Sequence, residues 1–161
     1  RDRVEYGVMT VRTMHRSRGT AAAAAMVLMV LAAGCGDTIY DPERATRVYP
    51  ADLHTTETLN IQVFRDDTTI ELVNATTRSF ENFDLWLNQR YVRRVQSLPA
   101  GGRVRLAISE FYDARGETPV AGGFFRTRAP TPMRLVEIQT DPEAPTLGLI
   151  AIPAEDVVSD R

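Results

Sequence analysis

The sequence predicts a small all-β domain, an antiparallel sandwich of seven or eight short strands. Three observations lead to this fold class. After residue 56, short runs alternate apolar and polar residues with a period of two. Turn-forming residues separate these runs at intervals of about ten residues. No window after residue 35 keeps an apolar stripe of helical period, so no long helix is expected there.

The predicted β domain covers residues 57–153. Each run ends at a turn sequence such as LPAGG, DARGE, APTP or DPEAP. This number and spacing of strands favours an immunoglobulin-like sandwich, and the acidic segment 154–161 is expected to be a frayed tail. Strands are expected at 58–64, 69–74, 83–88, 90–98, 103–109, 120–128, 133–140 and 147–153.

Residues 14–34 have the parts of an export signal peptide. Residues 14–18 supply a positive start, and residues 21–33 form an uncharged, mostly apolar run. The run is shorter than the roughly 20 residues that a membrane-spanning helix needs, so a permanent transmembrane anchor is disfavoured. Residues 1–13 carry mixed charge upstream of this signal, and we interpret them as an over-extended N-terminus.

The segment Leu31-Ala32-Ala33-Gly34-Cys35 resembles the lipobox of bacterial lipoproteins, although Ala32 stands where that family favours Leu. The resemblance implies a diacylglyceryl group on the Cys35 sulfur, cleavage between Gly34 and Cys35, and then an N-acyl chain such as palmitate on the freed amine of Cys35. Membrane lipid is then the first expected partner, and no other cofactor is expected. The alternative is an ordinary signal peptide, cut after Ala33 or Gly34, that leaves a free thiol.

The residues after Cys35 bear on location. In the sorting rules of two-membrane bacteria, Asp directly after the lipidated cysteine favours the inner membrane. Gly36 stands at that position here, and by resemblance this favours the outer membrane, facing the periplasm. The inner membrane and the cell surface are the alternatives. Residues 35–56 contain two prolines, many charges and no sustained periodicity, which predicts a flexible tether that begins at the lipidated cysteine.

Composition excludes several classes of site. From Cys35 onward the chain has 14 Arg against 19 acidic residues, a formal charge of −5, which disfavours a nucleic-acid partner. A single cysteine permits no internal disulfide and no Cys-based zinc site. After the signal peptide only His54 remains, inside the predicted tether, so we expect neither a Ser-His-Asp triad nor a zinc site of imidazoles.

Five carboxylates lie close together in the sequence and could in principle supply a hydrolytic pair. We interpret them as solvated strand and turn residues, since acids also blunt exposed sheet edges. No catalytic residue and no metal ligand is therefore assigned, and the chain is not expected to be an enzyme. The five are Glu81, Asp84, Glu110, Asp113 and Glu117.

The segment FDLWLNQRYVRRV, residues 83–95, predicts a β-hairpin. With Asn88-Gln89 as a two-residue loop, Trp86 lies opposite Tyr91 and Asp84 lies opposite Arg93. These four side chains would share one face and could stack on a sugar ring or hold a protein partner. The alternative is a structural cross-strand pair of Trp86 and Tyr91, partly covered by a loop.

The segment 70–115 also resembles small β-sandwich modules of bacterial lipoproteins, including the FxLYD type. The resemblance lies in a strand that ends at Asn74, in FDLWLN at 83–88 and in LPAGG at 98–102. It implies the fold and no catalytic residue. The favoured function is a non-enzymatic, lipid-anchored envelope protein that binds or positions another envelope protein. The alternatives are a carbohydrate-binding module and a carboxylate hydrolase.

Overall fold

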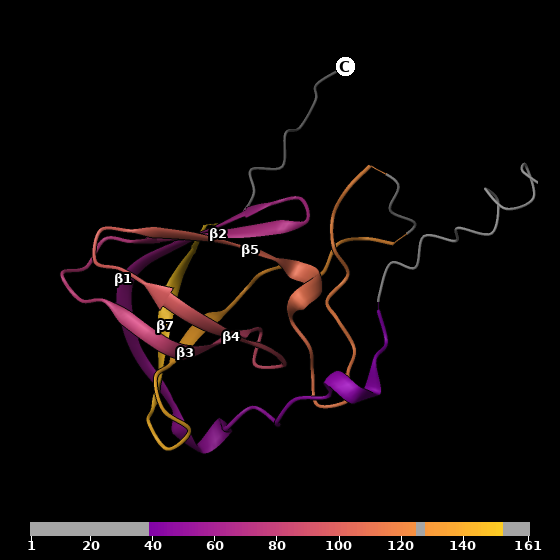
Figure 1. Ribbon diagram of the computed structural model, residues 1–161, viewed down its shortest axis with the longest axis horizontal. Helices are drawn as coiled ribbons and strands as arrows, with labels where there is room; N and C mark the ends of the chain where they lie inside the picture. The colour runs from indigo at the N-terminus through magenta and orange to yellow at the C-terminus, as the bar shows by residue number, and fades with distance from the viewer. Residues whose placement is uncertain (1–38, 125–127, 153–161) are drawn as a thin grey trace, which may run out of the picture. The chain divides into compact units, whose positions relative to one another are not determined.

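The computed structural model describes residues 39–124 and 128–152, which form a seven-stranded sheet around one core (Figure 1). The all-β prediction is confirmed. Short 3₁₀ turns flank the strands: η1 (Pro42–Arg44) and η2 (Ala51–Leu53) precede the first strand, and η3 (Ile108–Glu110) follows the fifth. The strands are β1 (His54–Asp66), β2 (Thr69–Asn74), β3 (Phe80–Leu87), β4 (Tyr91–Leu98), β5 (Arg103–Ala107), β6 (Val136–Gln139) and β7 (Thr146–Ile152).

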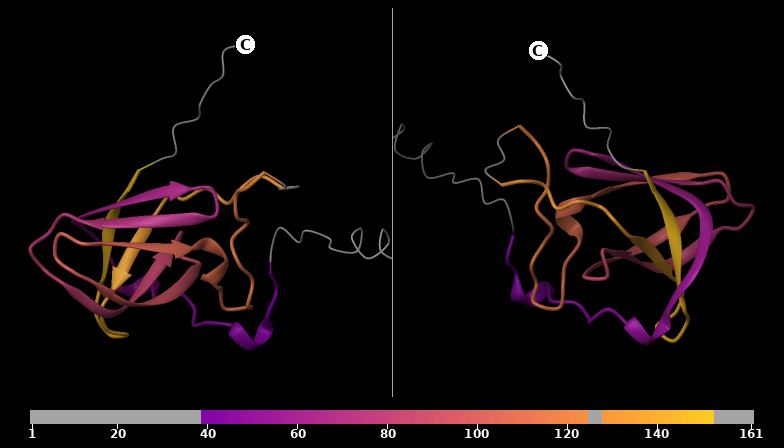
Figure 2. Two further views of the ribbon diagram at one scale, coloured as in Figure 1. Left: turned by 45° about the horizontal axis from the view of Figure 1, so that its top comes forward. Right: turned by 180° about the vertical axis from the view of Figure 1, so that it is seen from behind.

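The long strand β1 joins the two halves of the sheet. The strand order is β4-β3-β6-β7-β1-β2-β5, and Gln62 of β1 lies opposite both Val73 of β2 and Ile150 of β7. Strand β1 runs antiparallel to β2 but parallel to β7, so the prediction of a purely antiparallel sandwich is wrong at this pair. The sheet is mixed because the first and last strands run in the same direction side by side (Figure 2).

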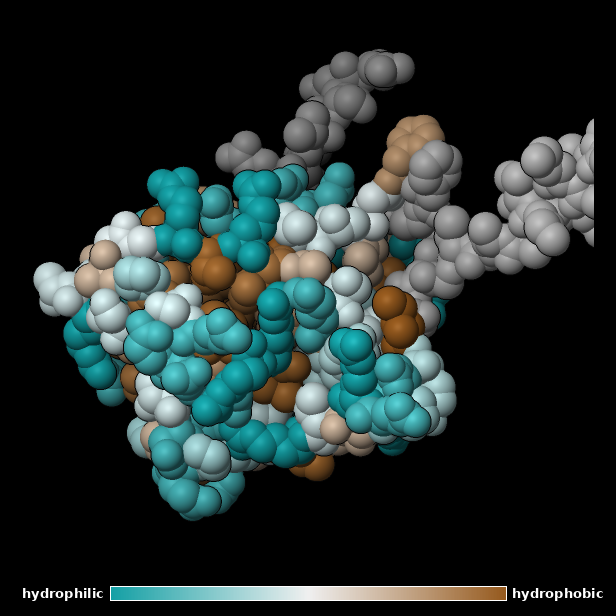
Figure 3. All heavy atoms as spheres, in the orientation of Figure 1, coloured by the Kyte–Doolittle hydropathy of each residue, from teal (hydrophilic) through white to brown (hydrophobic). Residues whose placement is uncertain are grey.

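The core follows from the alternation of apolar residues along the strands. In β2, Ile70 and Leu72 are buried while their neighbours are partly exposed, as a period of two requires. Charged and polar side chains cover much of the face in Figure 3, with apolar ones visible between them. The fully buried members of the core are Ile61, Val63, Leu72, Phe83, Leu85, Leu98, Phe111, Val136 and Ile138.

The predicted strand at 120–128 is wrong. The described part of this segment is irregular. Its main-chain groups bond to the neighbouring loop and to an arginine of β1, and they do not pair with another strand. The Val120 N–H donates to the Thr131 hydroxyl at 2.9 Å. The guanidinium of Arg65 donates to the carbonyls of Val120 and Thr131. Strand β6 accordingly starts only at Val136.

The predicted flexible tether at 35–56 is wrong from residue 39 onward. The Asp41 N–H donates to the Gly116 carbonyl at 2.8 Å, and the Thr118 N–H donates to the Ile39 carbonyl at 3.0 Å. Gly116 is at φ +82°, and a Cβ there would lie 2.0 Å from the Asp41 carbonyl oxygen. This close approach of two main chains requires glycine.

The start and the end of the sequence lie outside the described residues. The predicted signal peptide at 14–34, the lipobox cysteine Cys35 and the tail at 154–161 therefore stay predictions. Within the described ranges, no helix has the length and apolar character needed to cross a membrane.

Candidate functional site

Residues 45–53 form a strap that lies along the outer face of β3, β6 and β7. The strap links η1 to β1 and is drawn in purple in Figure 1. At its start, the Thr46 N–H donates to the Asp113 carbonyl at 3.0 Å and the Thr46 hydroxyl donates to the Tyr112 carbonyl at 2.9 Å. As a result, all four residues of β6 are buried, although Glu137 and Gln139 point away from the core.

Trp86 is fully buried beneath the strap, with 0% of its surface exposed. The Tyr49 ring meets it edge-on, with 5.3 Å between ring centroids. The Arg47 guanidinium lies 4.9 Å from the Trp86 ring centroid, in the geometry of a cation–π contact. The indole N–H donates to Gln139 Oε1 at 3.3 Å. At this position β3 is therefore covered on both faces, by the core on one and by the strap on the other.

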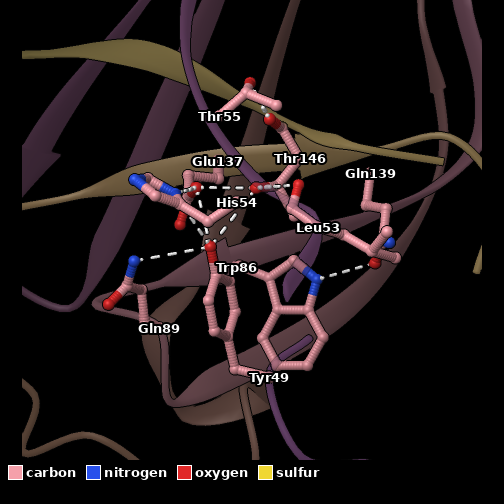
Figure 4. A network of polar contacts seen from close by, with 9 residues as sticks. All are labelled: Tyr49, Leu53, His54, Thr55, Trp86, Gln89, Glu137, Gln139 and Thr146. Carbon is pink, nitrogen blue, oxygen red and sulfur yellow. Dashed lines mark hydrogen bonds and ion pairs between the residues drawn. The ribbon is translucent and has the colours of Figure 1, made fainter. Parts of the chain in front are cut away.

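Glu137 is the buried acceptor on which the strap converges (Figure 4). Its Oε1 accepts hydrogen bonds from the Tyr49 hydroxyl at 2.9 Å, from the Thr146 hydroxyl at 2.9 Å and from His54 Nδ1 at 2.8 Å. Its Oε2 is buried and has no hydrogen-bond partner among the described residues. Burial raises the pKa of Tyr49, and the nearby Glu137 carboxylate raises it further, while the bond with Thr146 lowers it.

A histidine bonded to a buried carboxylate is the arrangement that orients a general base in hydrolases. Here the two hydroxyls beside the pair, those of Tyr49 and Thr146, both donate to the carboxylate itself. His54, predicted to be a solvated linker residue, is instead fixed at the start of β1 with a partly exposed side chain. This pair could not be predicted from the sequence, because 83 positions separate its members.

The predicted binding face of Trp86, Tyr91, Asp84 and Arg93 does not form. The hairpin loop contains Arg90 as well as Asn88 and Gln89, so Trp86 lies opposite Val92 and Asp84 lies opposite Arg94. This shift of one residue sends alternate side chains to the other face.

The four side chains consequently have separate environments. Tyr91 joins the core, and Arg93 is paired with Glu110. Asp84 is paired with Arg47 of the strap at 2.8 Å and with Arg94 at 2.9 Å. The alternative of a Trp86–Tyr91 cross-strand pair is also wrong, since the two lie on opposite faces of the sheet.

Of the five carboxylates, Asp113 is the most buried, and it organises a loop. Its Oδ1 accepts from the N–H groups of Arg115 and Glu117, both at 2.9 Å, and its Oδ2 accepts from Arg90 at 2.7 and 2.9 Å. Burial by itself would raise the pKa of Asp113, but these donors together lower it below the ordinary value.

Each of the other four carboxylates also has a basic or hydroxyl partner. Glu117 shares Arg90 with Asp113, Glu81 accepts from the Ser97 hydroxyl, and Glu110 and Asp84 bind the arginines given above. The structure therefore brings together only Asp113 and Glu117, with a guanidinium between them.

An open hollow of about 900 Å³ lies at the end of the domain where the described chain begins. Ile39 and Tyr40 line it, together with the arginines Arg90, Arg128 and Arg134. Sequence reasoning missed this hollow because its walls come from residues 39–40, the β3–β4 loop and the segment before β6, which are far apart in the sequence. Across the described ranges, no group of three His, Cys, Asp or Glu side chains is placed to hold a metal ion.

No family model, curated protein or solved structure matches this chain. We therefore infer its function from the residues and the geometry given above.

Proposed function

We propose that this chain is a lipid-anchored, non-enzymatic protein of the bacterial cell envelope and that its β domain binds another envelope protein. The observation that carries the proposal is the order of parts along the chain: a predicted export signal, Cys35 and, four residues later, Ile39, which is bonded to Thr118 of the domain. Acyl chains on Cys35 would hold the domain at a lipid surface. Gly36 after the cysteine favours the outer membrane, facing the periplasm.

The use of the acid–base groups supports a non-enzymatic role. His54 and Glu137 fix the strap, and Asp113 fixes the loop that follows η3. The carboxylates proposed for a hydrolase have separate basic or hydroxyl partners, apart from the two that share Arg90. We do not propose a carbohydrate-binding face, because Trp86 and Tyr91 are both buried.

The outer edge of β4 is the surface that best suits a protein partner. Val92 exchanges main-chain hydrogen bonds with Tyr112 on the side away from β3. Two and four residues further on, the main-chain groups of Arg94 and Gln96 point the same way, and no described residue bonds to them. Such an edge can accept an added strand from a partner.

The anchor is tested by mass spectrometry of the mature protein. We expect an N-terminus at Cys35 carrying a diacylglyceryl group and an acyl chain, and retention of the protein in the membrane fraction. Cys35→Ser should leave the precursor uncleaved and without lipid, while Gly34→Ala, which keeps a small residue before the cysteine, should still be processed. An unmodified Cys35, or an N-terminus elsewhere, would refute the anchor.

The partner is tested by crosslinking in intact cells. A photo-crosslinking amino acid at Gln96, on the β4 edge, should give one reproducible adduct with an envelope protein. The same amino acid at Glu57, which is exposed on the interior strand β1, serves as the control and should not give that adduct. Identical adducts from both positions, or none from Gln96, would count against partner binding at this edge.

A further inference from the structure

We propose that the arginine-lined hollow at the start of the domain docks on the headgroups of anionic phospholipids in the membrane that holds the anchor. This inference rests on the proposed lipidation of Cys35 and adds an orientation and a lipid class to it. Its first support is distance. Four residues extend at most about 14 Å, so Ile39 would stay within that distance of a lipidated Cys35.

The close spacing places the hollow beside the lipid. Ile39 and Tyr40 belong to the lining of the hollow, and both are exposed, at 48% and 67%. Main-chain bonds to residues 116–118 fix them to the domain, so the domain cannot swing away from the surface on a long tether. Apolar and aromatic side chains of this kind suit the interface between headgroups and acyl chains.

Charge complementarity supplies the second support. Three arginines line the hollow, and Arg90 is compensated by Asp113 and Glu117. Arg128 and Arg134 have no acidic partner among the described residues, and both are exposed. Together with Arg90 and its two carboxylate partners, they leave this region three arginines against two carboxylates, a net formal charge of +1, on a chain whose part from Cys35 onward is acidic overall.

Anionic headgroups are the ligand that fits two such arginines next to an anchor. A guanidinium binds phosphate oxygens through a fork of N–H donors. Each arginine near an anionic surface raises the partition constant by about fivefold. Two of them together favour the docked orientation by about 25-fold over the same surface without them.

The experiment uses the intact lipidated protein in vesicles. Mass spectrometry first establishes that Cys35 is acylated, so that failure of the anchor is seen separately from failure of docking. Tyr40→Cys then supplies the one free thiol, which is labelled with an environment-sensitive fluorophore. Vesicles of phosphatidylcholine are compared with vesicles that contain one third phosphatidylglycerol, both with a trace of headgroup spin-labelled lipid as quencher.

We expect strong quenching of the probe at position 40 in the anionic vesicles and weak quenching in the neutral ones. A probe introduced by Ala100→Cys, in the β4–β5 turn at the opposite end of the domain in Figure 1, should stay unquenched in both. The double variant Arg128→Glu/Arg134→Glu should reduce the docked fraction at least 25-fold relative to the undocked one.

A matched double variant controls for charge. Arg103→Glu/Arg105→Glu makes the same change of charge on β5, outside the hollow, and should alter the quenching less than twofold. Unchanged thermal transitions in both double variants would show that the fold is retained. Equal quenching in neutral and anionic vesicles, or no effect of the Arg128 and Arg134 changes on an acylated protein, would overturn the docking proposal and leave the lipid anchor standing.

Discussion

At the scale of single residues, Glu137 shows how one buried acceptor can fix a segment that contains no strand and only one short 3₁₀ turn, η2. The strap has no periodic pattern, and its position depends on side chains that each find a different partner. Tyr49 and His54 meet at one carboxylate oxygen of Glu137, while Arg47 reaches Asp84 and Gln139. Removal of that carboxylate would leave three donors without their acceptor, two of them within the buried part of the site.

We therefore expect Glu137→Ala to lower the free energy of unfolding by about 3 to 5 kcal/mol, as for other buried pairs that lose one partner. Glu137→Gln keeps one acceptor oxygen and should cost no more than about 2 kcal/mol. Urea denaturation measures both. Glu81→Ala removes an exposed carboxylate and should stay within about 0.5 kcal/mol of the parent. Equal losses for Glu137→Ala and Glu81→Ala would contradict this account.

Asp113 gives the domain a dependence on pH. Its pKa is lowered in the folded state, because the donors from Glu117, Arg90 and Arg115 outweigh the effect of burial. A lowered folded pKa stabilises the protein above the ordinary value of 3.8, and this stabilisation is lost as the pH falls through the folded pKa. We expect the stability difference between the parent and Asp113→Asn to be greatest near neutral pH and to shrink below about pH 4.

Urea denaturation at a series of pH values tests this expectation. Asp141→Asn, at an exposed turn carboxyl, is the control and should differ little from the parent at any pH. A stability difference between the parent and Asp113→Asn that grows as the pH falls would show that the predicted direction of the pH dependence is wrong.

At the scale of elements, the β3–β4 loop shows where sequence reasoning reached its limit. The pattern located the turn correctly at Asn88 and Gln89, which both have positive φ, at 52° and 56°. It did not reveal that Arg90 also belongs to the loop, because Arg90 leaves the ladder to bind Asp113, which lies 23 residues away. With Arg90 in the loop, Leu87 lies opposite Tyr91, and this shift of one residue removes the predicted binding face.

The two turn residues should respond differently to glycine. Gln89→Gly relieves a left-handed backbone and should leave the free energy of unfolding unchanged or raise it by up to about 1 kcal/mol. Asn88→Gly removes a side chain that accepts from the Arg134 and Leu135 N–H groups and donates to the Pro132 carbonyl. Asn88→Gly should therefore lower the free energy of unfolding by about 1 to 3 kcal/mol. Chemical denaturation of the two variants shows whether each one gains or loses stability. Equal effects at both positions would show that backbone strain alone decides.

The same distinction between local pattern and long-range contact explains which of the other elements could be predicted. The bounds of β2 were predicted correctly and those of β5 to within two residues, because both strands alternate strictly. Ile70 and Leu72 of β2 and Leu106 of β5 face the core. The predictions for the strap and for the segment at 120–128 were wrong, because contacts with residues distant in the sequence determine the structure of both segments. The hollow could not be predicted either, since no single segment encodes it.

At the scale of the whole molecule, the parallel contact between the first and last strands makes the sheet continuous. Local alternation specifies which face of a strand is buried but leaves its partner open, so the sequence could not reveal that β7 returns beside β1. The consequence is a sheet in which residues 62–64 have strand neighbours on both sides, while β4 and β5 lie at the edges.

This arrangement predicts an order of stability that hydrogen exchange can measure. The amides of Gln62, Val63 and Phe64 should exchange only through global unfolding, because successive N–H groups of β1 point alternately to its two neighbours, so that opening all three requires β1 to separate from both β2 and β7. The amides of Arg94 and Gln96 on the open side of β4 have no hydrogen-bond partner among the described residues, so they need no such opening and should exchange at least about tenfold faster. The Val92 amide, which is bonded to Tyr112, is the internal control and should be protected more strongly than the Arg94 and Gln96 amides. If residues 62–64 exchanged as fast as Arg94 and Gln96, β1 would not be the element that holds the two halves together, and the domain would unfold from its centre.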